Sequence, residues 1–271
     1  LSGERSGQDG TFHNNFNDRT GGRANFGFIP TQKLNFNVNV GYVQQEQQLP
    51  LSDNPSNSIL RNAYRAEAGG LAGQYLPGFK NYHPEFSNKY DRRMEHERLT
   101  LGMTANYNPF DWWQNRLTVG LDRRETQNKY QNQIDQTGGI LYSGNSAGGS
   151  VSIGTTRVWL WTVDYSGTAT HDLTDEWNSS FSAGMQMTRR QAESYSISGN
   201  GFVANSLNLV SSAANRNAGQ GFSEQTSLGF FVQEQVGWRN RLFATAAVRV
   251  DDNSAFGSEF SLVAYPKASL S

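Results

Sequence analysis

The carboxy-terminal stretch from Glu224 to Ser271, EQTSLGFFVQEQVGWRNRLFATAAVRVDDNSAFGSEFSLVAYPKASLS, is the most informative for the fold class. Between Leu228 and Trp238, apolar residues alternate with small and polar ones, which is typical of a strand with one apolar face. Arg239-Asn240 interrupts the alternation, and a second alternating run follows from Leu242 to Val250. The two runs predict a hairpin with arms of roughly 12 to 15 residues, against the five or six usual in soluble sheets. A membrane-spanning strand needs about 9 to 11 residues, so these arms are long enough to cross a bilayer.

The same alternation recurs along most of the chain. In Leu34–Tyr42 the apolar residues share one face and three asparagines share the other, which a buried soluble strand would not tolerate. Further alternating runs predict strands at Arg23–Ile29, Leu99–Tyr107, Leu117–Leu121, Trp159–Thr170, Trp177–Met187 and Phe260–Ala264. Residues Leu1–Gly22 keep no period and are rich in Gly, Asn and Asp, so we expect a loop there.

The connections between these strands alternate between short and long. The short ones lie near Pro30, Pro109, Asp172 and Arg239. The long ones are predicted at Gln48–Arg93, which includes a short helix at Ser58–Ala68, at Tyr130–Gly154, at Ser198–Ser223 and, as the shortest, at Asn253–Ser258. Bacterial outer-membrane barrels have this asymmetry of turns and loops. The tryptophans agree with two interfacial girdles, since four lie beside short turns and two near the long-loop end: Trp112, Trp113, Trp177 and Trp238, then Trp159 and Trp161.

Composition is compatible with a membrane protein that crosses with strands. The 271 residues are 36% hydrophobic, and the mean hydropathy is −0.65. Strands with a single apolar face average to such mild hydrophilicity. The net charge of −1 gives no electrostatic reason to expect a nucleic-acid partner, and the absence of cysteine excludes disulfides and thiol chemistry. Because the chain begins at Leu1 without methionine or a signal peptide, we interpret it as part of a longer protein.

These patterns predict an all-β fold, an antiparallel transmembrane β-barrel segment with about nine to ten long strands. Residues 1–271 are expected to form one partial barrel domain. A soluble β-sandwich or a secreted β-solenoid is the alternative, but strand length and loop alternation argue against both. An open sheet cannot expose its edges to lipid, so either the remaining strands lie outside this sequence or copies of the chain assemble.

The segment RLFATAAVRVDDNSAFGSEFSLVAYPKASLS resembles the late barrel region of TonB-dependent outer-membrane receptors of the SusC/RagA type. In that family a strand ending in Arg-x-Asp is followed by a Ser-x-Phe-Gly loop and an aromatic-Pro strand. The matching positions are Arg249, Asp251, Ser254, Phe256, Gly257, Tyr265 and Pro266. The amino-terminal plug, the TonB box and the aromatic-ended final strand of the family are not found in this sequence.

The resemblance implies a barrel of about 22 strands in the outer membrane of a Gram-negative-type bacterium. It also implies active, TonB-dependent import of a bulky nutrient such as an oligosaccharide, a peptide or a metal chelate by the longer parent protein. The implied partners are the TonB complex, reached through the missing amino-terminal part, and a surface lipoprotein lid. A passive outer-membrane porin or a surface adhesin is the alternative function.

Two sets of residues are candidate ligand sites. The first long loop carries aromatic residues that can stack on sugar rings or other flat ligands, or that pack the loop against itself: Tyr64, Tyr75, Phe79, Tyr82, Phe86 and Tyr90. Polar residues with the parity of the barrel interior are expected to form a hydrated lumen wall that touches substrate or plug: Asp122, Arg124, Asp164, Gln186, Arg190, Gln233 and Arg249.

Two arginines have the parity of the lipid-facing residues instead. Arg123 and Arg189 lie near the outer ends of their strands. They can meet the phosphates of lipopolysaccharide, which with other outer-membrane lipid is an expected partner. Alternatively, their guanidinium groups extend to the interface without specific binding.

Motifs of catalysis and metal binding are weak. Gly144–Gly148 matches G-x-S-x-G, and Asp164 and His171 follow in the order of a hydrolase triad. However, these two residues are seven apart on a predicted strand, about 23 Å at 3.3 Å per residue, so they cannot touch. The histidines lack ligand spacing, and Asp251-Asp252-Asn253 lacks the spacing of a calcium loop. We therefore expect no enzyme activity, no metal and no cofactor.

Overall fold

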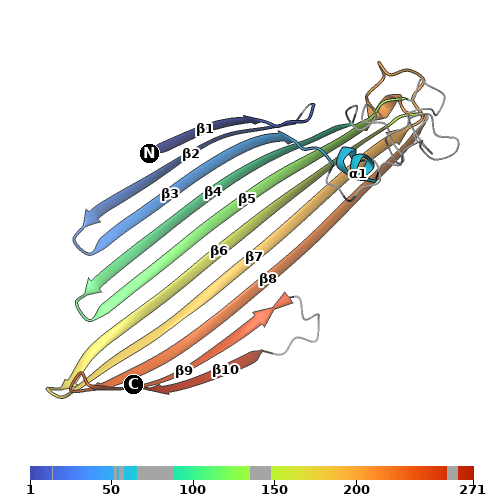
Figure 1. Cartoon of the computed structure of the whole chain (residues 1–271). Coiled ribbons are helices and arrows are strands. Elements are labelled where there is room, and N and C mark those ends of the chain that lie inside the picture. Colours follow the sequence, from blue (N-terminus) through green and yellow to red (C-terminus); the bar gives the residue numbers. More distant parts are fainter. Residues whose placement is uncertain are drawn as a thin grey trace.

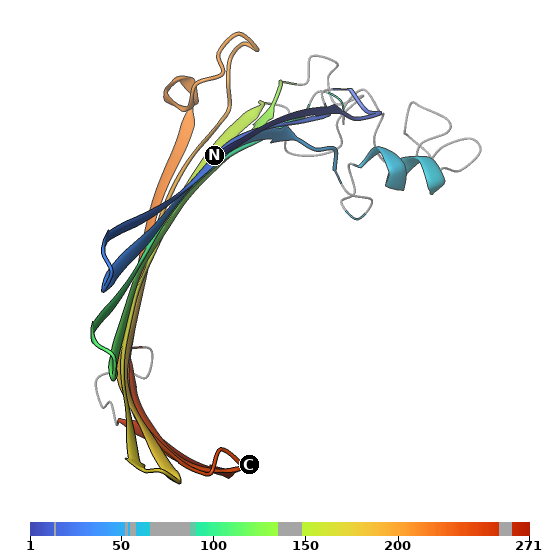
Figure 2. The same ribbon diagram turned by 90° about the vertical axis from the view of Figure 1, so that its left-hand side faces the viewer.

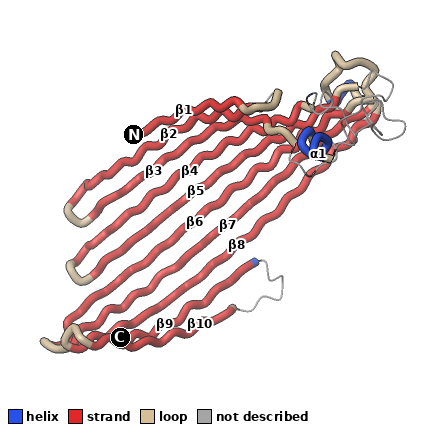
Figure 3. Tube along the Cα trace, viewed as in Figure 1, coloured by secondary structure: helices blue, strands red, loops and turns tan. Residues whose placement is uncertain are grey.

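The computed structural model of the chain describes residues 1–13, 15–51, 54, 58–65, 88, 90–134, 148–254 and 262–271. These residues form one ten-stranded antiparallel sheet in which each strand pairs with its neighbours in sequence (Figures 1 and 3). The strands are β1 (Ser2–Asp9), β2 (Phe16–Thr31), β3 (Leu34–Gln48), β4 (Asp91–Phe110), β5 (Trp113–Asn132), β6 (Ser150–Thr174), β7 (Trp177–Asn200), β8 (Asn215–Trp238), β9 (Leu242–Asn253) and β10 (Val263–Leu270). The predicted all-β fold with nine to ten long strands is confirmed.

The sheet is a single curved layer, which Figure 2 shows edge-on as an arc. In the described part of the chain, the buried apolar residues are only Val151, Val158, Phe202 and Ala213. No second sheet or layer of helices covers either face in the described residues. A β-sandwich would instead bury one face of each sheet against the other, so the soluble alternative does not fit.

The apolar residues of successive strands form one continuous row. Val38 pairs with Phe26 on one side and with Met103 on the other, and Met103 pairs in turn with Val119. Because paired residues point to the same face of a sheet, the row continues across the sheet. We call this row the apolar belt: Phe26, Phe28, Leu34, Phe36, Val38, Val40, Leu99, Leu101, Met103, Leu117, Val119, Leu121, Trp161, Val163, Tyr165, Met185, Met187, Phe230, Val232, Val248 and Val250.

The belt is exposed rather than buried. Phe26 is 60% exposed, Phe28 63% and Phe230 52%, although these are large apolar side chains. A continuous exposed apolar surface of this kind identifies a face that something other than this chain covers. Its position on strands long enough to cross a bilayer is what a lipid-facing barrel wall requires.

The predicted alternation of turns and loops is confirmed. The turns β2–β3, β4–β5, β6–β7 and β8–β9 lie at one end of the sheet, and the strand ends that the long connections join lie at the other (Figure 1). The tight turn predicted at Arg239-Asn240 is confirmed. Both residues have a left-handed backbone conformation, with φ of 50° and 56°. Arg241 N donates to the Trp238 carbonyl at 2.9 Å and closes the turn.

The strands extend further than the sequence patterns predicted. The loop predicted at Leu1–Gly22 is wrong, because β1 and the first part of β2 occupy most of it, with Arg5 paired to Thr20. The loop predicted at Ser198–Ser223 is also too long, because β8 begins at Asn215. Beyond the belt both faces meet water, so these strand ends are stabilised by backbone pairing and need no apolar alternation.

The predicted helix is present but short. α1 (Ile59–Tyr64) is capped at its amino-terminal end by Ser58, whose hydroxyl accepts a hydrogen bond from Arg61 N at 3.1 Å. Asn62 Nδ2 donates a hydrogen bond to the Ser58 carbonyl at 2.7 Å. The predicted residues after Arg65 lie outside the described part of the chain. None of the described helices is long and apolar enough to cross a membrane.

One connection at the long-loop end has its own small core. Phe202 and Ala213, on either side of the 3-10 turn η1 (Val210–Ser212), pack with Val151 of β6. The backbone of Phe202 donates to the Gly148 carbonyl at 2.7 Å. The connection between β7 and β8 is therefore folded onto its neighbours.

Candidate functional site

The face opposite the apolar belt is polar and forms the candidate site. Near the short turns, neutral side chains on this face form hydrogen bonds across the strands. Asn106 Nδ2 donates to Asn35 Oδ1 at 2.8 Å, and the hydroxyls of Thr104 and Thr118 lie 3.3 Å apart. The row of asparagines in β3 thus belongs to a water-facing ladder of side chains that pair across strands.

Further toward the loops, the polar face becomes charged. Arg98 Nε donates to Asp122 Oδ2 at 2.9 Å, and Arg124 Nε lies 3.7 Å from the other oxygen of the same carboxylate. Arg249 Nε donates to Asp251 Oδ1 at 2.7 Å. Each cation is half-exposed, so these ion pairs orient side chains more than they stabilise the fold.

The register places all the predicted lumen-wall residues on this one face. The structure brings Asp164, Gln186 and Arg249 together around a hollow of about 450 Å³, which Phe231 and Arg116 also line. Arg249 Nη2 donates to Gln186 Oε1 at 3.0 Å across it. Asp122 and Arg124 meet in the ion pair described above. The other two predicted residues, Arg190 and Gln233, lie elsewhere on the same face.

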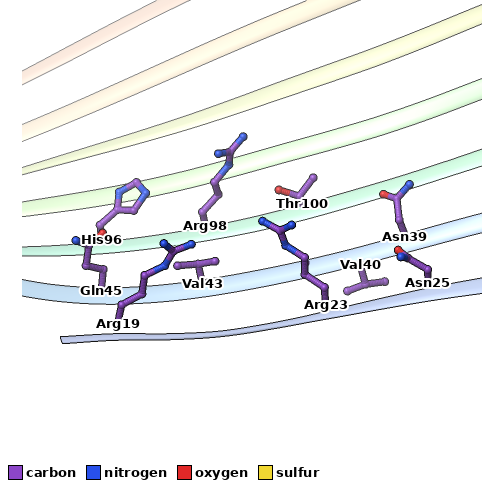
Figure 4. A pocket seen from close by; sticks show the side chains of 11 residues that line it. Arg19, Arg23, Asn25, Asn39, Val40, Val43, Gln45, His96, Arg98 and Thr100 are labelled. Carbon is purple, nitrogen blue, oxygen red and sulfur yellow. The ribbon is translucent and has the colours of Figure 1, made fainter. Parts of the chain in front are cut away.

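A second hollow on the same face was missed by sequence reasoning. It has a volume of about 540 Å³ and lies over β2, β3 and β4, where Arg19, Arg23 and Arg98 extend their side chains (Figure 4). Arg19 falls in the stretch predicted as a loop. The alternation of Arg19 and Gly21 in front of the predicted strand Arg23–Ile29 was an available signal, but these two positions hold no apolar residue to mark them as part of that strand.

His96 also lines this second hollow, on the loop side of the apolar belt. Its Nδ1 lies 2.9 Å from Thr126 Oγ1. Burial and then the nearby guanidinium groups of Arg124 and Arg98 lower the pKa of His96 below its ordinary value. The electrostatic environment of this hollow therefore disfavours a further positive charge.

On the opposite face, charged residues begin where the belt ends. Arg123 Nη2 lies 2.7 Å from Glu125, which also pairs with Arg157 at 3.1 Å. Arg189 Nε donates to Glu224 at 3.0 Å. The two arginines that sequence analysis singled out as lipopolysaccharide contacts are thus already paired with carboxylates.

The predicted capture-loop aromatics lie largely outside the described residues, namely Tyr75, Phe79, Tyr82 and Phe86. Tyr64 lies in α1 and is 66% exposed. The Arg92 guanidinium lies over the Tyr90 ring at 5.4 Å and over the Tyr130 ring at 5.2 Å. Tyr90 is thereby packed at the start of β4, and it lines a hollow to which Ile59 and Leu60 of α1 contribute but Tyr64 does not.

In the described residues, the members of the candidate hydrolase triad are not brought together, and no cluster of metal ligands is found. Asp164 and His171 lie on β6 with opposite parity, so their side chains point to opposite faces, and His171 stacks on Trp112 at 5.4 Å. Ser146 of the G-x-S-x-G match lies outside the described part. Among the described residues, no three His, Asp or Glu residues are grouped as metal ligands would be.

Comparison with solved structures gives matches that cover nearly all of the chain. The RagAB peptide transporter aligns with a TM-score of 0.77 and 14% identity, covering 94% of this chain and 30% of that one. The ferric citrate transporter FecA aligns with a TM-score of 0.52 and 11% identity, covering 97% and 34%. The ferric preacinetobactin receptor BauA of Acinetobacter baumannii aligns with a TM-score of 0.54 and 10% identity, covering 99% and 39%.

At these identities the likeness concerns the fold, and the chain spans between 30% and 39% of the length of these three proteins. A search of curated protein sequences found no match. The sequence model of the family described as "TonB dependent receptor-like, beta-barrel" matches residues 30–271. With its exposed apolar belt, polar opposite face and alternation of turns and loops, the chain belongs to the TonB-dependent receptor-like β-barrel family, whose members are located in the outer membrane of Gram-negative-type bacteria.

Proposed function

We propose that this chain is part of the barrel wall of an outer-membrane receptor that imports a bulky nutrient with energy supplied through TonB. The observation that carries the proposal is the division of one curved sheet into two faces, exposed and apolar on one side, polar and hollowed on the other. Such a wall separates lipid from a water-filled passage wide enough to need a plug. Residues 1–271 form one partial barrel domain in this proposal.

The nutrient class is an oligosaccharide, a peptide or a metal chelate. The names of the structural relatives include a peptide transporter and receptors for iron chelates, which supports a bulky ligand without selecting among these classes. Recognition is assigned to the aromatic residues of the first long loop and to the polar wall: Tyr64, Tyr75, Phe79, Tyr82, Phe86 and Tyr90, then Asp122, Arg124, Asp164, Arg190, Gln233 and Arg249. The protein acts by binding and transport, not by catalysis, and needs no cofactor.

The partners follow from this function. In this proposal the TonB complex acts on an amino-terminal part of the parent protein, and a surface lipoprotein closes the passage from outside. Outer-membrane lipid covers the apolar belt, and lipopolysaccharide meets the paired charges beyond it, around Arg123 and Arg189. Because these arginines are paired with carboxylates, we assign them an interfacial role rather than a specific phosphate site.

The test is uptake by the parent protein in a host that depends on it. Cells that carry the intact gene are grown with single peptides, oligosaccharides or iron chelates as the limiting nutrient, beside a strain that lacks the gene and a strain that lacks TonB. We expect one nutrient class to need both the gene and TonB. Uptake that needs the gene but not TonB would favour the passive porin, and adhesion without any uptake would favour the adhesin.

A separate variant tests the aromatic residues of the first long loop. Changing Tyr75, Phe79 and Tyr82 together to alanine is expected to raise the nutrient concentration for half-maximal uptake, since each stacked ring contributes binding energy. Unchanged uptake and affinity for every nutrient that the receptor imports would remove these residues from the site.

A further inference from the structure

The hollow over β2, β3 and β4 is formed by side chains that the sheet register places side by side on the polar face. In the sheet register Arg23 lies beside Gly41, and Gly41 lies beside Thr100. Four residues further toward the loops, Arg19 lies beside Gln45, and Gln45 lies beside His96. Figure 4 shows the Arg19 and Arg23 side chains rising from β2 on the same side of the sheet as Arg98 from β4.

Two of its arginines lack an acidic partner. In the described part of the chain, neither Arg19 nor Arg23 forms an ion pair or a side-chain hydrogen bond, whereas Arg98 is paired with Asp122. Glu4 lines an adjoining hollow with Arg19 and Arg23 without an ion pair to either. Positive charge on this part of the polar face is therefore incompletely balanced.

Gly41 leaves the space between the flanking strands open. A Cβ at this position would lie 3.8 Å from Arg23 Cγ and 3.9 Å from Thr100 Cβ, which are ordinary van der Waals distances. A methyl group therefore fits there without strain, and a longer side chain would extend into the hollow. Glycine at this position keeps the floor of the hollow free beside the Arg23 side chain.

Unpaired guanidinium groups at the edge of an open hollow are suited to oxyanions. Each guanidinium offers several N–H donors in a planar fork that matches carboxylate or phosphate geometry. The Arg19 side chain is partly shielded from water, which strengthens such charge-assisted hydrogen bonds, whereas Arg23 is exposed and contributes mainly its charge and its N–H donors. Neutral ligands gain little from the same groups.

We propose that this hollow, with Arg19 and Arg23 as its free cations and Arg98 as a third, binds oxyanion groups of the ligand that passes through the barrel. The proposal rests on the import function proposed above and adds a charge preference to it. Carboxylate and phosphate share the required chemistry, and the experiment separates them. Arg19 and Arg23 are the binding residues, and Gly41 is the residue that keeps their surroundings open.

The experiment uses the full-length parent protein purified in detergent. Binding of three pentapeptides is measured by isothermal titration calorimetry at low salt: Ala-Glu-Glu-Glu-Ala, a counterpart with phosphoserine in place of glutamate, and a neutral counterpart with glutamine. We expect at least one anionic peptide to bind about tenfold more tightly than the neutral one, with the preference reduced at high salt. The stronger of the two anionic peptides identifies the oxyanion.

Two independent changes should remove this preference. The double variant Arg19→Gln, Arg23→Gln deletes the free cations, and Gly41→Glu places a carboxylate of the chain itself into the hollow. Both are expected to weaken the anionic peptide about tenfold and to leave the neutral peptide unchanged. Gly41→Ala should keep the preference, as should Arg5→Gln, which removes an exposed arginine on the other face of β1.

The outcomes separate this inference from the import function. Assembly of each variant is checked by the shift in gel mobility that folded barrels show before heating. If wild-type protein binds all three peptides alike, or if assembled Gly41→Glu protein keeps the full preference, the oxyanion site is refuted. TonB-dependent growth on the natural nutrient in the same strains reports on import itself, so the two ideas fail by different measurements.

Discussion

At the scale of single residues, glycine explains why aromatic rings lie on a polar face. Phe231 has the parity of the polar face, and its ring lies against Gly184 on the neighbouring strand. A Cβ at Gly184 would be 2.6 Å from Phe231 Cε1 and 2.3 Å from the Tyr165 carbonyl oxygen. The ring covers backbone that has no side chain of its own, a known device for glycine within sheets.

Gly184 is therefore expected to tolerate no side chain. Because the clash involves a backbone oxygen, Gly184→Ala should lower the free energy of unfolding by roughly 1 to 3 kcal/mol. Urea unfolding of the full-length protein in lipid vesicles, followed by tryptophan fluorescence, measures the change. Gly154→Ala is the matched control, since nothing lies within 4 Å of a Cβ there, and it should be neutral or slightly stabilising. Equal effects of the two changes would contradict the packing argument.

At the scale of the strand, each long strand has a lipid-facing part and a water-facing continuation. β6 has 25 residues and β7 has 24, well beyond what a bilayer requires. Their far ends carry paired charges such as Arg157 with Glu125. Polar residues on both faces are stable there because the backbone of each strand is paired with its neighbours and water solvates the side chains.

Charge on the lipid-facing part of a strand should prevent assembly, whereas charge on the other face should not. Phe230→Arg places a guanidinium in the apolar belt of β8 and should cost roughly 2 to 4 kcal/mol if it lies near the bilayer midplane. Gln233→Arg, three residues along the same strand, points to the polar face. We expect little folded Phe230→Arg receptor in isolated outer membranes and near-normal amounts of Gln233→Arg. Comparable amounts of both would mean that the belt does not face lipid.

At the scale of the whole molecule, the sheet is open. β1 and β10 each pair with a single strand within the described residues. Unpaired backbone groups at such an edge are costly in a lipid environment, because no water is present to satisfy them. The curvature in Figure 2 is compatible with a wall that closes through further strands.

Hydrogen exchange of the parent protein in lipid tests this closure. If further strands pair with both edges, amides of β1 and β10 should exchange as slowly as those of β6, at the centre of the sheet. The amide of Asn240, in the turn between β8 and β9, provides the fast-exchanging control. Fast exchange throughout β1 and β10 would show that these edges remain unpaired and would contradict closure of the wall by further strands.

Much of the fold can be predicted from local sequence patterns. The hairpin around Arg239 and the asparagines on the face opposite Val38 show how the alternation of residues predicts the strands and their two faces. The spacing of these strands predicts which connections are short turns. The parity of Asp122, Arg124 and Arg249 also places them together on the polar face. The extent of the strands cannot be predicted in this way, because beyond the belt the backbone pairs without any apolar alternation to mark it.

That this protein crosses a membrane with strands follows from the sequence, because lipid on one face and water on the other impose an alternation with period two. Which distant residues meet is known only from the folded sheet. Arg19 and Arg98 line one hollow because antiparallel pairing places β3, with Gly41, between their strands. The register between strands is set by the apolar faces and turn geometry of several strands together, so the pattern within one strand does not show which side chains of the neighbouring strands lie beside it.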